Sequence, residues 1–220
     1  MNVKLTDRRM ETYGGCRWAL GKEKRDAYLG EMCAKGGFHF YRDALLAVFL
    51  NSAHADFYNP LGFECVPGGA YMDAPDKSKT QAMTLVREIE LPQPTARQRV
   101  LFGVLVTWRV LKLVGWSLPN WESWALLVMR GSPDALAACI SARASARAAA
   151  NRTYPAADAA NIIYSAARAA ADAYAVADVE VEAEAYSASA AESAARAYAA
   201  SAAIYTGALN MVGLAHEAMR

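Results

Sequence analysis

Alanine is concentrated in one part of this chain. Residues 131–220 contain 36 alanines in 90 positions, whereas residues 1–130 contain only 12. Alanine has the highest helix propensity, but its methyl group buries little apolar surface, so alanine-rich helices must approach one another closely. The composition therefore predicts a helical second half and a boundary near Gly131.

Local signals position the helices within the alanine-rich half. Ser132, Pro133 and Asp134 supply an N-cap, a first-turn proline and a first-turn carboxylate for a helix that continues to about residue 152. Pro155 starts a second helix in the same way. Residues 178–184 favour a break, because their carboxylates would repel one another at helical spacing. We expect three or four helices, the last over residues 207–220.

The first half has the pattern of a mixed α and β domain. A stretch without Gly or Pro over residues 43–57 places Leu46, Phe49, Leu50 and Ala53 on one helical face. Short runs rich in aromatic or branched residues, bounded by glycine pairs, predict strands around this helix. The predicted strands cover residues 16–20, 38–41, 62–66 and 83–89. This order of strands and helix predicts an α+β fold.

A tryptophan-rich segment lies between the two halves. We divide the chain into a mixed α/β domain over 1–95, a helical connector over 96–130 and an alanine-rich helical domain over 131–220. A core helix is expected over 100–116, because Arg109 and Lys112 interrupt a stretch too short for a membrane span. Its expected apolar stripe consists of Leu101, Val104, Leu105, Trp108 and Leu111.

Four of the five tryptophans fall within this segment and the helix after it. One interpretation is that they pack between the two halves of the chain. The other is that they anchor a partner, since tryptophan is enriched among interface hot spots. The four residues are Trp108, Trp116, Trp121 and Trp124.

Net charge and cysteine content argue against several classes of protein, including general nucleic-acid binders and disulfide-rich secreted proteins. The formal net charge is +1, so there is no general nucleic-acid or membrane signature. The four cysteines share no CxxC spacing, which suits a reducing cytosol. The first ten residues contain no apolar signal-peptide core, so export is not expected.

Motifs for common chemistries are absent from the sequence. It contains no phosphate-binding loop, dinucleotide fingerprint or nucleophile elbow, and its three histidines are scattered, so we expect no metal and no cofactor. Arg143 and Arg147, one helical turn apart, can be interpreted either as a phosphate grip or as the solvated face of a helix. Tyrosines of the alanine-rich half can pack between helices or line a ligand groove.

One constellation in the first half has catalytic residue types. His39 and Tyr41 are two residues apart on a predicted strand, so their side chains point to the same face. A carboxylate could come from a later strand, with Glu64 as the first choice and Glu88 and Glu90 as others. This layout resembles ADP-ribosyltransferase-like sites, in which His and Tyr hold NAD and Glu orients the ribose. Hydrogen-bonded structural residues are the alternative interpretation.

Several motifs of the first half occur together: Tyr13-Gly14-Gly15-Cys16-Arg17-Trp18, Met32-Cys33-Ala34-Lys35-Gly36-Gly37-Phe38-His39-Phe40-Tyr41, Ala53-His54-Ala55-Asp56-Phe57 and Arg87-Glu88-Ile89-Glu90-Leu91-Pro92. With these motifs, residues 3–92 resemble a small domain of unassigned function found in tailed bacteriophages and bacteria. Downstream, Trp124 is followed by Gly131-Ser132-Pro133-Asp134-Ala135-Leu136 and the alanine-rich helices, and this part resembles an alanine-rich helical module described as immunity-protein-like. Neither family supplies a catalytic residue to transfer.

The resemblance implies a phage accessory protein that acts in the cytoplasm of a bacterial host. We expect a non-enzymatic protein that binds a host protein, such as a component of a defence system. The alternatives are an NAD-using transferase or glycohydrolase at His39 and Tyr41, and a protein that sequesters a small nucleotide signal. Alanine-rich faces also favour a homodimer.

Overall fold

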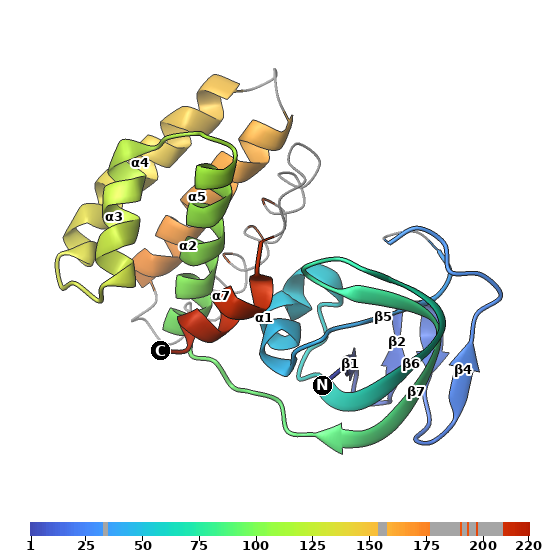
Figure 1. Cartoon of the computed structure of the whole chain (residues 1–220). Coiled ribbons are helices and arrows are strands. Elements are labelled where there is room, and N and C mark those ends of the chain that lie inside the picture. Colours follow the sequence, from blue (N-terminus) through green and yellow to red (C-terminus); the bar gives the residue numbers. More distant parts are fainter. Residues whose placement is uncertain (33–34, 154–157, 177–189, 191–192, 194–196, 198–208) are drawn as a thin grey trace. The chain divides into compact units, whose positions relative to one another are not determined.

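The computed structural model of the chain contains two compact units, Met1–Gln93 and Pro94–Arg220 (Figure 1). It describes residues 1–32, 35–153, 158–176, 190, 193, 197 and 209–220. Each unit is considered by itself. The architecture is α+β: an antiparallel sheet with a short helix, followed by helices that pack together. The predicted fold class is therefore confirmed.

The first unit contains short strands, one helix and a long hairpin. In chain order the elements are β1 (Val3–Thr6), β2 (Glu11–Thr12), the 3-10 turn η1 (Tyr13–Gly15), β3 (Cys16–Arg17), β4 (Glu23–Arg25), β5 (Phe38–Phe40), α1 (Ala44–His54), β6 (Leu61–Asp73) and β7 (Ser78–Ile89). β2 and β3 form a separate two-stranded hairpin. The main sheet has the order β1-β6-β7-β4, and β5 also pairs with β7.

The main sheet curls around its core. Val3 of β1 pairs with Tyr41, the residue that follows β5, and two backbone hydrogen bonds of 2.7 and 2.8 Å join them. β1 therefore contacts both β6 and the end of β5. The register of the β6–β7 hairpin shifts twice, between Glu64 and Cys65 and between Gly68 and Tyr71. Such bulges bend a strand and increase its twist, which lets the hairpin wrap around the core.

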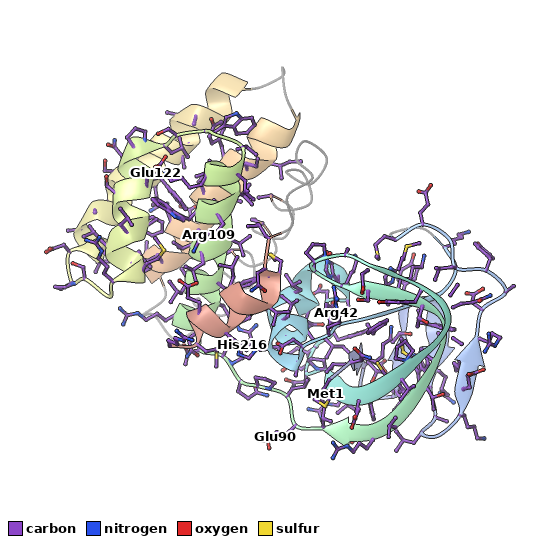
Figure 2. The ribbon with its side chains drawn as sticks, in the orientation of Figure 1. Met1, Arg42, Glu90, Arg109, Glu122 and His216 are labelled. Atoms are coloured by element: carbon purple, nitrogen blue, oxygen red, sulfur yellow. The ribbon has the colours of Figure 1, made fainter. Side chains whose placement is uncertain are left out.

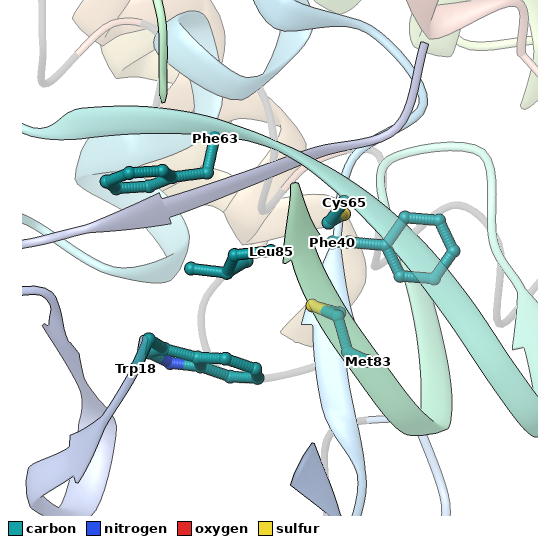
Figure 3. Packing of buried hydrophobic residues seen from close by; sticks show 6 residues of the cluster. All are labelled: Trp18, Phe40, Phe63, Cys65, Met83 and Leu85. Carbon is teal, nitrogen blue, oxygen red and sulfur yellow. The ribbon is translucent and has the colours of Figure 1, made fainter. Parts of the chain in front are cut away.

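The core of the first unit is assembled from several strands. Its side chains converge from β5, β6, β7 and the segment after β3 (Figure 3). Burying a large apolar side chain contributes roughly 1.5–3 kcal/mol, so this cluster is the main stabilising feature of the sheet. The cluster consists of Trp18, Phe40, Phe63, Cys65, Met83 and Leu85.

Helix α1 forms where its sequence predicts it, although it is shorter. The Asp43 carboxylate caps it by accepting hydrogen bonds from the backbone N–H groups of Leu45 and Leu46, at 2.9 and 3.0 Å. The helix ends at His54 because the Asn51 side chain binds the backbone of Phe57 on both its N–H and its C=O. Leu46 and Phe49 are buried, as the predicted stripe requires, and so is Leu50.

The strand predictions were incomplete in two ways. The segment 16–20 is a strand only over Cys16–Arg17, with an isolated bridge at Leu20. The predicted strands 62–66 and 83–89 are parts of the longer β6 and β7. Gly68 and Gly69 were predicted to end a strand, but they form the bulge inside β6, where Gly69 adopts a φ of +72°.

The described part of the second unit is helical. Its helices are α2 (Ala96–Leu113), α3 (Pro119–Met129), α4 (Ala135–Thr153), α5 (Asp158–Val176) and α7 (Met211–Ala218). Thr95 and Gln98 form a reciprocal capping box at the start of α2. Ser132 accepts a 3.3 Å hydrogen bond from the Asp134 N–H, and α4 begins at Ala135 rather than at Pro133. The predicted start at Pro155 and the break at 178–184 lie outside the described residues.

Helix α2 is buried on more than the expected stripe. Every residue from Phe102 to Thr107 is buried, whereas Leu101 and Trp108 are half-buried. The reason is that α2 packs against α3, α5 and α7 and so contacts other helices on several sides. The tryptophan-rich segment 96–130 is thus part of the same unit as the alanine-rich helices. No helix among the described residues is long and apolar enough to cross a membrane.

Helices α4 and α5 pack through small residues. Cys139, Ala142 and Ala146 of α4 are buried, as are Ala167 and Ala170 of α5. Two backbone carbonyls of α5 also accept hydrogen bonds from neighbouring helices. The Trp121 indole N–H donates to the Ala167 carbonyl at 2.7 Å, and the Cys139 thiol donates to the Ala171 carbonyl at 3.1 Å. These contacts hold α3, α4 and α5 in one bundle.

Candidate functional site

His39 is tied to the backbone of the loop that precedes β5. Its Nε2 forms a short hydrogen bond with the Met32 carbonyl, and its own carbonyl accepts a 2.6 Å hydrogen bond from Lys4 Nζ. Burial lowers the pKa of His39 to about 4. The ring is therefore neutral at physiological pH, and because a carbonyl only accepts, Nε2 carries the proton. These contacts position His39 as an anchor for the loop.

Tyr41 belongs to a different polar group, which also contains His54 and Asp76. The Tyr41 hydroxyl lies 3.1 Å from His54 Nδ1, and His54 Nε2 lies 3.3 Å from a carboxylate oxygen of Asp76. Because the carboxylate accepts, His54 Nε2 carries a proton. Three separate elements contribute: the end of β5, the last turn of α1, and the turn between β6 and β7.

The electrostatics of this group favour a structural role. Burial, followed by the nearby charge of Asp76, raises the pKa of Tyr41, which is the opposite of what an activated phenolate nucleophile needs. Burial alone would raise the pKa of Asp76, but the hydrogen bond and charge of His54 hold it below its ordinary value. The side chains of His54 and Asp76 are each only 16% exposed. The group thus fastens α1 and β5 to the turn of the hairpin.

The carboxylate expected beside His39 and Tyr41 lies elsewhere. Glu64 forms a cross-strand ion pair with Arg87, with 2.6 Å between Oε2 and Nε. Among the residues that the structure describes, no hydrogen bond or ion pair connects Glu64 to His39 or Tyr41. The sequence pattern indicates carboxylates on strands but not Asp76, because a turn residue 35 positions after Tyr41 carries no periodic signal.

Two lysine side chains of the first unit are partly or fully shielded from solvent. Lys79 of β7 is fully buried, and its Nζ donates to the Glu31 carbonyl. Lys4 of β1 is half-buried, with its Nζ 5.7 Å from the centre of the Trp18 ring. Burial lowers the pKa of Lys4 to about 8. Burial also raises the pKa of the neighbouring Cys65 thiol to about 12, which makes that sulfur a poor nucleophile.

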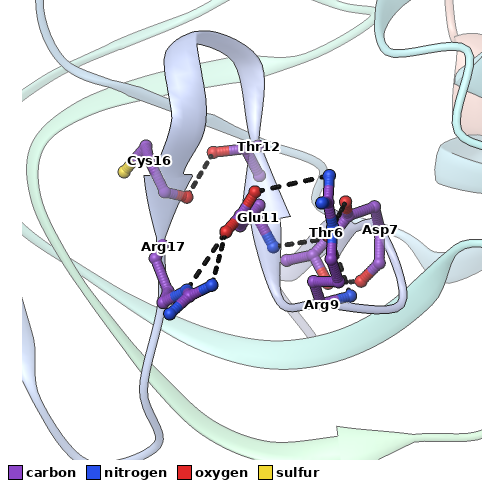
Figure 4. Close-up of polar contacts among 7 residues, drawn as sticks. All are labelled: Thr6, Asp7, Arg9, Glu11, Thr12, Cys16 and Arg17. Carbon is purple, nitrogen blue, oxygen red and sulfur yellow. Dashed lines mark hydrogen bonds and ion pairs between the residues drawn. The ribbon is translucent and has the colours of Figure 1, made fainter.

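The β2–β3 hairpin presents a fully exposed aromatic ring. Glu11 pairs with Arg17 at 2.9 Å and with Arg9 at 3.6 Å, and Asp7 accepts backbone N–H groups of Arg9 and Glu11 (Figure 4). Tyr13, in the turn of this hairpin, is 100% exposed. The surrounding ion pairs are exposed, and each contributes little to stability. Together they help to hold the conformation of the turn.

The predicted tryptophan residues have separate structural roles. Trp121 and Trp124 are fully buried inside the helical unit, with their ring centres 5.7 Å apart. Trp116 packs against Tyr164 at 5.6 Å, and Lys112 Nζ lies 4.6 Å above the Trp108 ring. Lys112 also pairs with Glu122 of α3, which is labelled in Figure 2. In this folded state Trp121 and Trp124 are not accessible to a partner.

Helix α4 exposes large apolar residues beside the two predicted arginines. Ile140 is 76% exposed and Leu136 is 55% exposed, and Arg143 and Arg147 are exposed as well. We call these four residues the outer seam of α4. Arg143 Nε forms a 2.5 Å ion pair with Asp172 of α5, whereas no ion pair joins Arg147 to another described residue.

Comparison with known proteins gave no relative. No protein-family model matches the chain, and neither a curated protein nor a solved structure matches it.

Proposed function

We propose that this chain is a non-enzymatic binding protein that engages another protein through the outer seam of α4. The observation that carries the proposal is the exposure of Ile140, at 76%, next to Leu136 on a helix whose adjacent face is buried against neighbouring helices. Exposed isoleucine is costly to hydrate and stabilises a complex when buried, by roughly 25 cal/mol per Å² of apolar area. The four residues lie at i, i+4, i+7 and i+11 and therefore share one helical face.

The chemistry of the first unit supports a binding role more than a catalytic one. His39 and Tyr41 are each held by structural partners, and the Glu64 carboxylate is paired with Arg87. An NAD-using site would need these three groups to converge on one ligand. A nucleotide-binding groove lined by Tyr and Arg has as little support, because Tyr174 packs edge-to-face on Trp124 and Arg143 is paired with Asp172.

The partner we propose is a protein of a bacterial host. The support for this context is the resemblance of residues 3–92 to the tailed-phage and bacterial domain described above. In that setting the chain would act in the host cytoplasm and block a component of a defence system.

Affinity capture from bacterial lysate tests the proposal. Tagged full-length chain should recover a specific protein, and Ile140→Arg should reduce its recovery at least tenfold while the fold is retained. The matched control is Leu113→Arg, which places the same charge at another exposed apolar position of the helical unit. Equal recovery by the wild-type chain and Ile140→Arg would contradict the proposed face.

A ligand assay tests the two alternatives directly. Incubation of the folded chain with NAD should give no turnover, and a thermal-shift panel of cyclic nucleotides should leave the melting temperature unchanged. NAD consumption that His39→Ala abolishes, without loss of stability, would replace the binding proposal with an enzymatic one.

A further inference from the structure

We infer that the outer seam of α4 receives a single α-helix of the partner, with apolar residues against Leu136 and Ile140 and a carboxylate against Arg147. This inference rests on the proposed function and specifies the part of the partner that binds. It follows from the spacing of the seam, the size of the residues beside it, and the distribution of its charge.

The spacing of the outer seam matches helix-on-helix packing. Successive members are four, three and four residues apart, a mean spacing of about 3.7 residues, close to the 3.6-residue turn of an α-helix, so the row runs nearly along the helix axis and a second helix can pack along it. The inner face of α4 has the same spacing and already packs against a helix. Its buried members are Ala135, Cys139, Ala142, Ala146 and Ala149. The outer seam thus repeats the pattern of a face that binds a helix.

The seam is long enough for three turns of a partner helix. From Leu136 to Arg147 the chain advances eleven residues, or about 16.5 Å at 1.5 Å per residue. An extended strand has a side-chain period of two and would meet only part of this row. A helix can follow all four positions, so it is the element that buries both exposed apolar side chains at once.

Small residues beside the seam allow close approach. Ala137 and Ala144 are exposed next to Ile140 on the same side of α4. Their methyl groups leave room for a partner backbone, in the way that alanines allow α4 and α5 to pack closely. A large residue at either position would shield Leu136 and Ile140 from a second helix.

The two ends of the seam differ in charge. Its first half, Leu136 and Ile140, is apolar, and its second half carries two guanidinium groups. Arg143 is paired with Asp172 at 2.5 Å, and Asp172 also lies 3.8 Å from Arg168. Arg147 has no ion-pair partner among the described residues, so its charge is the one that a partner can complement. We therefore place a Glu or Asp of the partner helix opposite Arg147.

Designed helical peptides provide a probe that does not require the natural partner. Three peptides share one leucine seam and differ only at the position opposite Arg147, which carries Glu, Gln or Lys. Binding to the full-length chain is measured by fluorescence anisotropy. We expect the Glu peptide to bind about fivefold more tightly than the Lys peptide, which is at the upper end of the effect of an exposed ion pair.

Variants of the chain make the test specific to the seam. Arg147→Glu should reverse the order of the Glu and Lys peptides, and Ile140→Arg should weaken all three at least tenfold. Leu113→Arg should bind like the wild-type chain. A peptide with the same composition but a scrambled seam should not bind.

The outcomes separate this inference from the proposed function. Equal affinity for the Glu and Lys peptides would overturn the charge assignment. Absence of peptide binding, with lysate capture that still depends on Ile140, would overturn the helix as the docking element and leave the face intact. Failure of both experiments would overturn both proposals. Concentration-dependent dimerisation that Ile140→Arg abolishes, seen by sedimentation velocity, would make a second copy the occupant and also overturn the inference.

Discussion

The hydroxyl of Tyr41 lies 3.1 Å from Nδ1 of His54, and their rings stack with 5.9 Å between centres. This contact joins the residue after β5 to the last turn of α1. Through the opposite nitrogen, His54 also reaches Asp76 in the turn of the β6–β7 hairpin. One imidazole thus connects three parts of the first unit that are distant in sequence.

Replacing His54 with Ala should destabilise the first unit. Asp76 and Tyr41 would both lose their partner inside the protein, and leaving a shielded polar group unsatisfied costs about 1–3 kcal/mol. Urea unfolding should therefore show a lower midpoint. A double-mutant cycle with Tyr41→Phe and Asp76→Asn should give a non-zero coupling energy. Tyr58→Phe, which alters a ring that is 89% exposed, serves as the control and should leave stability unchanged.

The first unit should become more stable as the pH rises through the titration of Lys4. Burial lowers the pKa of Lys4 from 10.5 to about 8 in the folded chain. Between these values the unfolded chain binds more protons than the folded chain, so the free energy of unfolding increases with pH.

The Lys4→Met variant isolates this effect. From pH 8 to pH 10, the free energy of unfolding of the wild type should increase relative to that of Lys4→Met. Taking the difference removes the titrating groups that do not interact with Lys4, and repeating the comparison in a Cys65→Ser background removes the coupled thiol. Lys22→Met, at an exposed position, should show no such trend. A constant difference across this range would contradict the lowered pKa of Lys4.

Cys65 and Cys139 should resist thiol reagents until the chain unfolds. Both side chains are buried, and burial raises the pKa of Cys65 to about 12 and that of Cys139 to about 11. Since the thiolate is the reacting form, alkylation of the native chain should be slow at both sites. Cys65 lies in the first unit and Cys139 in the second, so pulsed alkylation with mass spectrometry reports the unfolding of each unit separately. Rapid native labelling at either site would contradict its burial.

Two threonines near or in α2 should respond in opposite directions to substitution by valine. The Thr107 hydroxyl is buried and has no hydrogen-bond partner among the described residues, so Thr107→Val should raise the free energy of unfolding by about 1 kcal/mol. The Thr95 hydroxyl accepts a hydrogen bond from the Gln98 backbone N–H at 3.2 Å in the capping box. Thr95→Val should therefore lower the free energy of unfolding by about 1 kcal/mol. Thermal unfolding of the two variants provides the comparison, and a loss of stability in Thr107→Val would show that its hydroxyl is satisfied.

The sequence alone predicted the features that depend on local interactions. Alanine content predicted the helices of the second half, and the region without Gly or Pro around Phe49 predicted α1. Helix propensity, capping and periodicity act between residues a few positions apart, so they can be recognised directly in the sequence. The same spacing rule placed Arg143 and Arg147 on one helix face.

The tertiary structure decided the features that depend on contacts between distant residues. The pairing of His54 with Asp76 and of Glu64 with Arg87 depends on which strands and turns meet, and sequence spacing does not encode that. Gly68 and Gly69 have the same turn chemistry whether a strand ends there or bulges. Only the register of β6 against β7 determines which occurs, because backbone pairing across the hairpin continues past the glycines. Likewise, the exposure of Ile140 follows from which face of α4 the neighbouring helices cover, a property of the packed bundle that the sequence of α4 does not contain.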